Sequence, residues 1–296
     1  MIYNDIYIHS IMKKIKLIIL SLACLIVNNS HAQTTFTTYA LASQQKSGIM
    51  NVQYHYNFPF VYTNDEAELT GIEIDIIKQF AVWLKIKKGI DVKLEFERHD
   101  DFAKFYEKVK ITKAVSVGAG SVTVTPDRAR EIKFSSPYLK NKPVLVSSIL
   151  KSTLTDIRNI SKEFNGMTAV IVKGSVHEKL IKNIKDNYWP ELKIELVESP
   201  AIVLDKISNS NKYFGYLDLI SYWATIQKES KPIKIHRATP FDTEYFAFIF
   251  PKSSDWSAAF NEFFDGGLGF PASDAYFEIL RKHLSSELVN SVALTY

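Results

Sequence analysis

A guanidinium stands where a helix backbone is already electropositive, in the stretch GSVTVTPDRARE from Gly120 to Glu131. Thr125 followed by Pro126 predicts a helix start, with a hydroxyl N-cap and then proline at the first helical position. The first turn of a helix favours negative charge, because its unpaired N–H groups make that end positive. The third helical position of a capping box would carry Glu or Gln, but here it is Arg128.

An anion docked at this helix N-terminus would account for Arg128. Backbone N–H groups, Thr123, Thr125 and the two-pronged guanidinium would together hold a carboxylate. The competing interpretation is a surface arginine paired with Asp127 or Glu131. The motif taken alone favours this second, purely structural interpretation.

Two other positions are candidates for ligand contact. The stretch KGSVHEKL, from Lys173 to Leu180, predicts a strand, a glycine and then a helix opened by Ser175-x-x-Glu178. A capping box explains this pattern without a ligand, although the carboxyl end of a strand is also where open α/β sheets bind ligands. Asp218 ends an apolar strand in FGYLDLISY. It could cap the following helix or receive an ammonium group, and the pattern does not separate the two.

Familiar catalytic and cofactor motifs are missing from the sequence. It contains no G-x-S-x-G, no H-E-x-x-H, no P-loop and no G-x-G-x-x-G after a strand. His99 stands beside Asp100 and Asp101, but one histidine with two adjacent acids at a helix start is far more typical of a cap than of a metal site. We therefore expect no enzyme activity, no cofactor and no metal.

The elements that must position these residues alternate along the chain. The 296 residues are 46% hydrophobic, enough for one large or two medium domains. Apolar runs and amphipathic stretches follow one another twice, which predicts parallel, doubly wound α/β sheets in two lobes with a cleft between them. The predicted strands are 49–54, 92–96, 114–120, 142–151, 167–173, 193–197, 213–217 and 244–251. The predicted helices are 71–84, 100–109, one starting at Thr125, 176–187, 201–209, 219–228, 256–266 and 273–284.

The first 32 residues have the pattern of an export signal. A basic segment (12–16) precedes an eleven-residue apolar core (17–27), and Ser30-x-Ala32 has the small-x-small pattern of a signal peptidase site. The apolar run is too short to span a bilayer as a stable helix. We therefore expect export to the periplasm and a mature chain from about Gln33.

Cys24, the single cysteine, lies inside this signal. Lipidation would need an aliphatic residue three positions earlier, where Ser21 stands, so a lipoprotein is the second interpretation. The mature chain would have no disulfide, no thiol nucleophile and no Cys-ligated metal. Its 33 basic and 31 acidic residues give a net charge of +2, which offers no argument for nucleic acid or a membrane surface.

Two stretches together resemble a known family. NFPFVYTNDEAELTGIEIDIIKQFA (57–81) and SVTVTPDRAREIKFSSPYL (121–139) resemble the family 3 periplasmic solute-binding proteins, the polar amino-acid receptors of ABC importers. That family has a PPF stretch, then G-x-D-x-D opening a helix, then T-x-T-x-x-R…F-S-x-P-Y. The matching positions here are Pro59-Phe60, Gly71 to Asp75, Thr123 to Arg128 and Phe134 to Tyr138. The KGS turn and the YLD strand end follow at family spacing, so the resemblance covers nearly the whole mature chain.

The resemblance implies a role for each candidate residue. Arg128 would clamp the α-carboxylate of an amino acid, and Asp218 would take its α-ammonium group. Four residues would complete the clamp: Thr123 and Ser121 from the first lobe, and Ser175 and Val176 from the second. Aromatic residues would wall the side-chain pocket: Tyr54, Phe60 and Phe102.

Three departures from the family pattern concern side-chain preference rather than the clamp. Ser116 stands where the family usually has an acid in the strand before T-x-T. Phe58 takes the second proline-like position of the PPF stretch, and YFEILRKHL replaces the usual tryptophan-lysine ending.

The resemblance also implies an organisation and a function. Lobe 1 would comprise residues 49–143 plus 241–296, lobe 2 would comprise 144–240, and two hinge strands would join them. The expected function is binding of a small α-amino acid for delivery to an ABC permease in the inner membrane, by a monomer without a nucleic-acid partner. A cyclohexadienyl dehydratase-like enzyme and a sensory ligand-binding protein are the alternatives, since the fold alone does not fix the function.

Overall fold

The computed structural model describes residues 35–238, 243–266 and 269–294. The predicted export signal (1–32) and Cys24 lie outside the described residues. Within those three ranges, no helix is long and apolar enough to cross a membrane.

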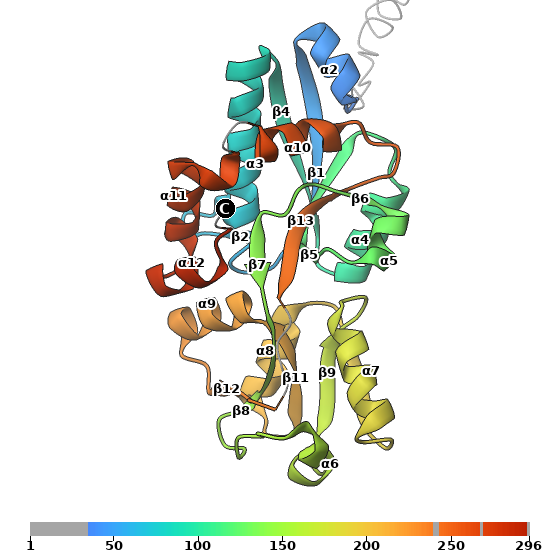
Figure 1. Ribbon diagram of the computed structural model, residues 1–296, viewed down its shortest axis with the longest axis vertical. Coiled ribbons are helices and arrows are strands. Elements are labelled where there is room, and N and C mark those ends of the chain that lie inside the picture. Colours follow the sequence, from blue (N-terminus) through green and yellow to red (C-terminus); the bar gives the residue numbers. More distant parts are fainter. Residues whose placement is uncertain (1–34, 239–242, 267–268, 295–296) are drawn as a thin grey trace, which may run out of the picture. The chain divides into compact units, whose positions relative to one another are not determined.

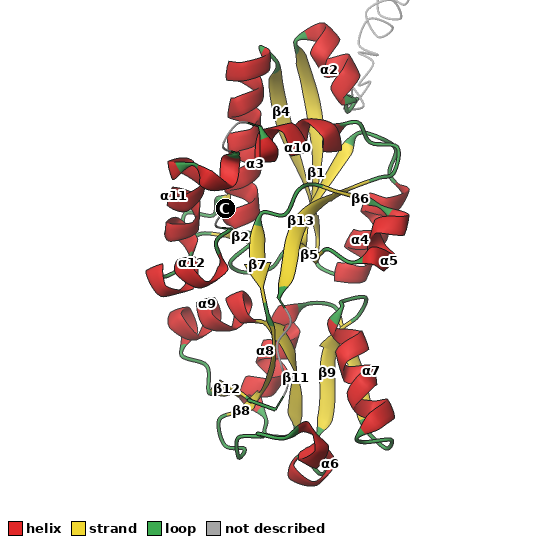
Figure 2. Ribbon diagram, viewed as in Figure 1, coloured by secondary structure: helices red, strands yellow, loops and turns green. Residues whose placement is uncertain are grey.

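The first sheet has six strands, in the order β4–β1–β5–β13–β6, with β7 paired to β13 (Figures 1 and 2). β1 runs parallel to β4 and β5, so the carboxyl ends of β1 and β5 lie at the same edge of the sheet. β13 runs antiparallel to β5, β6 and β7. The strand bounds are β1 (Ser47–His55), β4 (Asp91–His99), β5 (Ser116–Thr123), β6 (Lys133–Phe134), β7 (Leu139–Asn141) and β13 (Glu244–Phe250).

Helices from both ends of the chain pack on this sheet. They are α2 (Tyr39–Gln45), α3 (Ile72–Trp83), α4 (Phe102–Ile111), α5 (Pro126–Glu131), α10 (Trp256–Asp265), α11 (Asp274–His283) and α12 (Ser286–Val292). One core joins α3 to α10, where the rings of Phe80 and Phe260 lie 3.9 Å apart, centroid to centroid. A separate core contains Phe105 and Val109 of α4 with Val122 of β5. Side chains on both faces of β5 therefore pack in a core, and the helices hold this strand in place.

The second sheet has five strands, in the order β10–β9–β11–β8–β12. β9 is parallel to β10 and β11, whereas β8 is antiparallel to β11 and β12. The strands are β8 (Pro143–Ser148), β9 (Thr168–Val172), β10 (Lys193–Val197), β11 (Tyr213–Asp218) and β12 (Ile233–Ile235). The helices of this part are α6 (Ile160–Glu163), α7 (His177–Asn187), α8 (Pro200–Asn209) and α9 (Leu219–Glu229).

The structure differs from the predicted sheets in strand direction. Both sheets were expected to be parallel, but β13 and β8 are antiparallel to their neighbours. The predicted strand 142–151 is also shorter, because Asn141 ends β7 in the first sheet and Pro143 begins β8 in the second. The chain therefore passes from one sheet to the other at Lys142. An apolar run specifies burial but not strand direction, so the alternating pattern did not predict the antiparallel strands.

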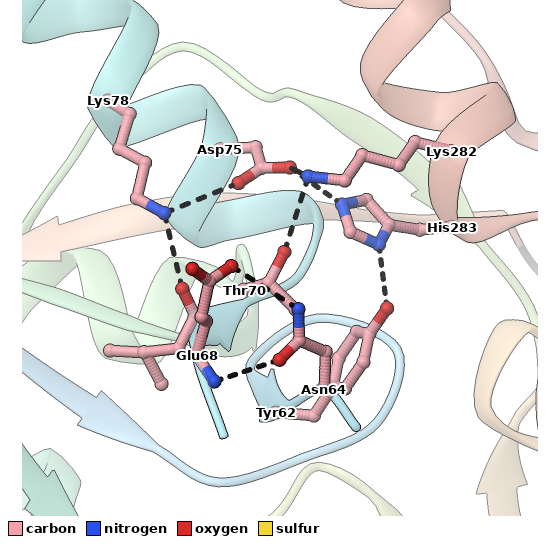
Figure 3. A network of polar contacts seen from close by, with 9 residues as sticks. Tyr62, Asn64, Glu68, Thr70, Asp75, Lys78, Lys282 and His283 are labelled. Atoms are coloured by element: carbon pink, nitrogen blue, oxygen red, sulfur yellow. Dashed lines mark hydrogen bonds and ion pairs between the residues drawn. The ribbon is translucent and has the colours of Figure 1, made fainter. Parts of the chain in front are cut away.

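A polar network ties α11 to α3 and to the small hairpin β2 (Tyr62–Thr63) and β3 (Leu69–Thr70) (Figure 3). His283 Nε2 lies 2.9 Å from Asp75 Oδ2, and its Nδ1 lies 3.0 Å from the Tyr62 hydroxyl. Lys282 Nζ donates to Asp75 Oδ2 at 2.7 Å. Burial raises the pKa of Asp75, but the bonds from His283 and Lys282 outweigh it and leave that pKa below its ordinary value. The network fixes the start of α3, just after the sharp turn at Gly71.

We expect Gly71→Ala to destabilise the fold by about 2–4 kcal/mol, from backbone strain plus steric overlap. Gly71 has a φ of +126°, and a Cβ there would lie 2.2 Å from the Phe60 carbonyl oxygen. Gly89 is the matched control, because its φ is +66° but a Cβ added there would meet no atom within 4 Å. Gly89→Ala should cost only about 1 kcal/mol. Urea unfolding curves measure both losses, and equal losses would contradict the steric argument.

Candidate functional site

A cavity lies where the carboxyl ends of β1 and β5 face those of β9 and β11. Its volume is about 40 Å³, room for roughly three water molecules. Seven of the nine predicted site residues line it: Phe102, Ser121, Thr123, Arg128, Ser175, Val176 and Asp218. The other lining residues are His55, Asn57, Val172, His177, Pro200, Tyr216 and Leu217.

Arg128 projects from α5, whose start is as predicted. The Thr125 side chain caps the helix by accepting from the Arg128 backbone N–H at 3.2 Å. The guanidinium donates to two carbonyl oxygens at 3.0 Å, Nη1 to Thr123 and Nη2 to Gly174. It lies over the rings of Phe102 and Tyr106, at 5.6 and 5.4 Å from their centroids. Burial lowers the pKa of Arg128 from its usual value.

The two carboxylates proposed as surface partners for Arg128 pair with other residues. Asp127 forms ion pairs with Arg130, at 2.9 Å, and with Lys179. Glu131 pairs with Lys110 at 2.9 Å. The guanidinium therefore faces the cavity rather than a surface carboxylate.

Ser121, near the end of β5, adopts an unusual backbone conformation with a φ of +47°. Its N–H donates to both carboxylate oxygens of Glu73 at 3.1 Å, and its hydroxyl accepts from Asn57 Nδ2 at 3.0 Å. Glu73 is fully buried and also accepts from the Tyr138 hydroxyl at 2.7 Å. Burial raises the pKa of Glu73 to about 7, against the lowering effect of these hydrogen bonds. Glu73 thus holds the backbone of Ser121, which lines the cavity, in place from the buried side. The family motif did not reveal this role.

The turn after β9 differs from the predicted capping box. Ser175 does not cap α7, because the N-cap position belongs to Val176 and the Ser175 hydroxyl donates to the Val172 carbonyl at 2.7 Å. Glu178 does reach back, to the Gly174 N–H. Gly174 has a φ of +78°, which lets its carbonyl oxygen turn toward Arg128. Helix α7 begins one residue later than the predicted capping box requires, so its N-cap is Val176 rather than Ser175.

Asp218 lies at the end of β11 with 12% of its side chain exposed, and that side chain does not cap α9. Its Oδ1 accepts from Asn141 Nδ2 at 2.8 Å and lies 3.6 Å from His177 Nε2. The same Asn141 amide donates to Glu244 Oε2 at 3.3 Å. Burial, and then the negative charge of Glu244, raise the pKa of Asp218 to about 8, although Asn141 and Arg128 oppose the shift.

The predicted aromatic wall needs correction at two positions. Phe60 is fully buried against Phe246, and Tyr54 packs in the same core with its ring 6.5 Å from Phe96, so neither lines the cavity. Successive residues of a strand point to opposite faces, and in β1 it is His55 that points to the cavity. Tyr54 and His55 are neighbours in β1 and face opposite sides of the sheet, so the residue beside the core-facing Tyr54 is the one that lines the cavity.

Contacts across the cavity join the two lobes. The Phe102 backbone N–H donates to the Glu198 carbonyl oxygen at 3.0 Å. The Arg128 bond to Gly174 and the Asp127–Lys179 ion pair lie on the same side, between α5 and the start of α7. Entry of a ligand therefore requires these contacts to break or to rearrange.

Comparison with protein families decides the classification. Residues 50–285 match the bacterial extracellular solute-binding proteins, family 3. The chain belongs to this family. The resemblance carried by the T-x-T-x-x-R…F-S-x-P-Y run is thereby confirmed.

Solved structures with the same fold are solute-binding proteins at low sequence identity. An ancestral arginine-binding protein bound to arginine has a TM-score of 0.63 and 17% identity, over 79% of this chain and 97% of that one. A substrate-binding protein of an ABC uptake transporter from Streptococcus pneumoniae, with bound histidine, has a TM-score of 0.66 and 17% identity, over 83% and 95%. The solute receptor for L-cysteine of Neisseria gonorrhoeae has a TM-score of 0.65 and 18% identity, over 88% of this chain and 100% of that one. These similarities establish the two-lobed fold of this family 3 protein.

Curated relatives with similar sequences are larger proteins. Membrane-bound lytic murein transglycosylase F of Saccharophagus degradans is 25% identical over 214 residues, which are 70% of this chain and 38% of that protein. The protein of the same name from Pseudomonas fluorescens is 26% identical over 164 residues, 55% of this chain and 31% of the relative. This family 3 chain thus spans about a third of the length of these relatives.

Proposed function

We propose that this family 3 protein binds a small α-amino acid in the cavity between its lobes and delivers it to an ABC permease from the periplasm. The mature protein acts as a monomer and carries out no reaction on the ligand. Residues 49–143 plus 241–296 form lobe 1 of this proposal, and residues 144–240 form lobe 2.

The observation that carries the proposal is the pair Arg128 and Asp218 in one cavity. They come from α5 on one lobe and β11 on the other. A guanidinium offers two parallel N–H donors to a carboxylate, and Arg128 already directs both of its outer nitrogens at oxygen acceptors. In the proposed complex, the ligand carboxylate replaces the Gly174 carbonyl as the acceptor for Nη2.

The surroundings of the pair also suit a zwitterion. Ser121 and Thr123 line the cavity beside Arg128, and the turn at Ser175 and Val176 lines it from the second lobe. An ammonium group beside Asp218 would favour its charged form and reverse the raised pKa of this carboxyl. The limited cavity volume favours a small side chain, or a wider separation of the lobes for a larger one.

Contacts from both lobes explain why binding would be linked to closure. A ligand that touches both walls stabilises the arrangement in which both walls are near it, which is a population shift. A permease or a membrane-bound sensor can then distinguish loaded from empty protein.

Melting temperatures with a panel of amino acids test the proposal, on protein treated with a metal chelator. A ligand at about 100 times its dissociation constant should stabilise the protein by roughly 2.7 kcal/mol. At least one amino acid should raise the melting temperature, whereas sugars should not. An unchanged melting temperature with every amino acid, together with a shift for a sugar, would contradict the proposal.

A further inference from the structure

Three side chains of types that can bind a metal ion lie close together, and two of them, His177 and Asp218, line the cavity. They are His177 from α7, Asp218 from β11 and Glu244 from β13, and one possible ligand atom from each lies within 4.8 Å of the others. The Nε2 of His177 and the Oδ1 of Asp218 are 3.6 Å apart. Two ligand atoms on opposite sides of a Zn²⁺ ion lie about 4.4 Å apart at most, so small side-chain movements would let a single ion contact all three.

The imidazole of His177 is the observation that points to a ligand. The residue is 6% exposed, and its Nε2 has no hydrogen-bond partner among the residues that the structure describes. A buried polar atom without a partner costs free energy that a bound group would recover. The ring faces Asp218 and lines the cavity, so a bound group would be shared with that carboxylate.

The charges around His177 favour a cation. The Asn141 amide donates to both Asp218 and Glu244, which brings two carboxylates to one neutral donor. Two carboxylates this close repel each other when both are charged. The positive charge of Arg128 also acts on this cluster and offsets part of the negative charge, although its hydrogen bonds go to the carbonyl oxygens of Thr123 and Gly174. A neutral imidazole offers a nitrogen lone pair to a metal ion.

We propose that His177, Asp218 and Glu244 bind a divalent transition-metal ion, for which Zn²⁺ is the test ion. One imidazole nitrogen and two carboxylate oxygens suit Zn²⁺ better than Ca²⁺ or Mg²⁺, which prefer oxygen ligands alone. Three protein ligands leave one position open toward the cavity, for water or a ligand group. Because Glu244 begins β13 of the first sheet and the other two residues belong to the second lobe, the ion would link the lobes.

This inference shares Asp218 with the proposed function but does not rest on it. The neutral amino group of an amino acid is itself a ligand for Zn²⁺, so an amino acid can occupy the open coordination position of the ion. Metal binding without amino acid, and amino-acid binding in chelator, are therefore measured separately. Either can fail while the other succeeds.

Isothermal titration of chelator-stripped wild-type protein with ZnCl₂ tests the site. We expect saturable binding of one Zn²⁺ per chain and much weaker binding of Ca²⁺ and Mg²⁺. His177→Gln and Glu244→Gln should each weaken Zn²⁺ binding by roughly 10-fold or more, since even outer-sphere changes cost about 10–100-fold. Asp186→Asn is the matched control, because Asp186 is an exposed acid of α7 and its loss should not matter. Equal Zn²⁺ affinity in His177→Gln and wild type would overturn the proposal.

X-ray absorption on the wild-type protein loaded with Zn²⁺ covers the case in which a variant does not fold. The expected signal is nitrogen and oxygen scatterers at about 2.0–2.2 Å, with imidazole scattering and no sulfur. A spectrum without imidazole, or the absence of saturable binding by wild type, would also overturn the proposal.

Discussion

Arg128→Ala is expected to weaken amino-acid binding by roughly 30-fold to several thousand-fold. Removing one partner of a buried, hydrogen-bonded charge pair typically costs about 2–5 kcal/mol, and each 1.4 kcal/mol is about tenfold in affinity. Arg128→Lys should restore binding only in part, because an ammonium group cannot make the planar two-point contact. Calorimetric titration with the best ligand of the panel measures both variants.

Arg130→Ala is the matched control for this prediction. Arg130 lies two residues along the same helix, is 77% exposed and pairs with Asp127. Exposed pairs contribute about 0–1 kcal/mol, so affinity should hardly change. A decarboxylated analogue completes the test, because it lacks only the group assigned to Arg128. Wild type should discriminate strongly against the amine and Arg128→Ala much less. Equal discrimination by both proteins would show that the carboxylate is held elsewhere.

Glu73→Gln is expected to change how stability depends on pH. The carboxyl of Glu73 ordinarily titrates near pH 4.5, and burial raises its pKa in the folded protein to about 7. The folded state therefore binds this proton more tightly than the unfolded chain. Between pH 4.5 and 7 this group makes the free energy of unfolding fall as pH rises, and its effect levels off above pH 7.

The expected size of this effect is roughly 3 kcal/mol over the whole window, at 1.36 kcal/mol per pKa unit. Relative to wild type, Glu73→Gln should thus gain stability as pH increases from 4.5 to 7.5, because it has no proton to lose. Urea unfolding at several pH values measures the difference between the two proteins. Glu107→Gln, on an exposed position of α4, is the control and should follow wild type. A constant difference between Glu73→Gln and wild type would refute the assignment.

The alternating pattern of the sequence was sufficient to predict most elements of the fold. Strand β10 has the predicted bounds Lys193–Val197, and α5 begins where Thr125 and Pro126 indicated. The strand before the motif is longer than the predicted 114–120, because β5 continues to Thr123. Short helices such as α2 and α12, of seven residues each, were missed. Two turns are too few to establish an apolar period, and tertiary packing stabilises such helices.

Site residues could be predicted only where a short motif carries them. Arg128 and Asp218 were found because one has an unexpected sign of charge and the other interrupts an apolar strand. His55 and His177 were missed, because lone histidines carry no local signal. They come together through the pairing of strands that lie far apart in the chain. Glu73 had a signal, an acid within an apolar helix start, but its partner Ser121 is 48 residues away.

Main-chain atoms take part in two of the three contacts described across the cavity. Phe102 and Glu198 join the lobes through an N–H and a carbonyl, and Arg128 holds two carbonyl oxygens rather than side chains. Point mutations replace side chains but leave the peptide group in place, proline excepted. Substitutions in the cavity lining that keep Arg128 can therefore change the lining and leave these main-chain partners in place. Under the proposed function, related chains can differ in their ligand and still share one mode of closure.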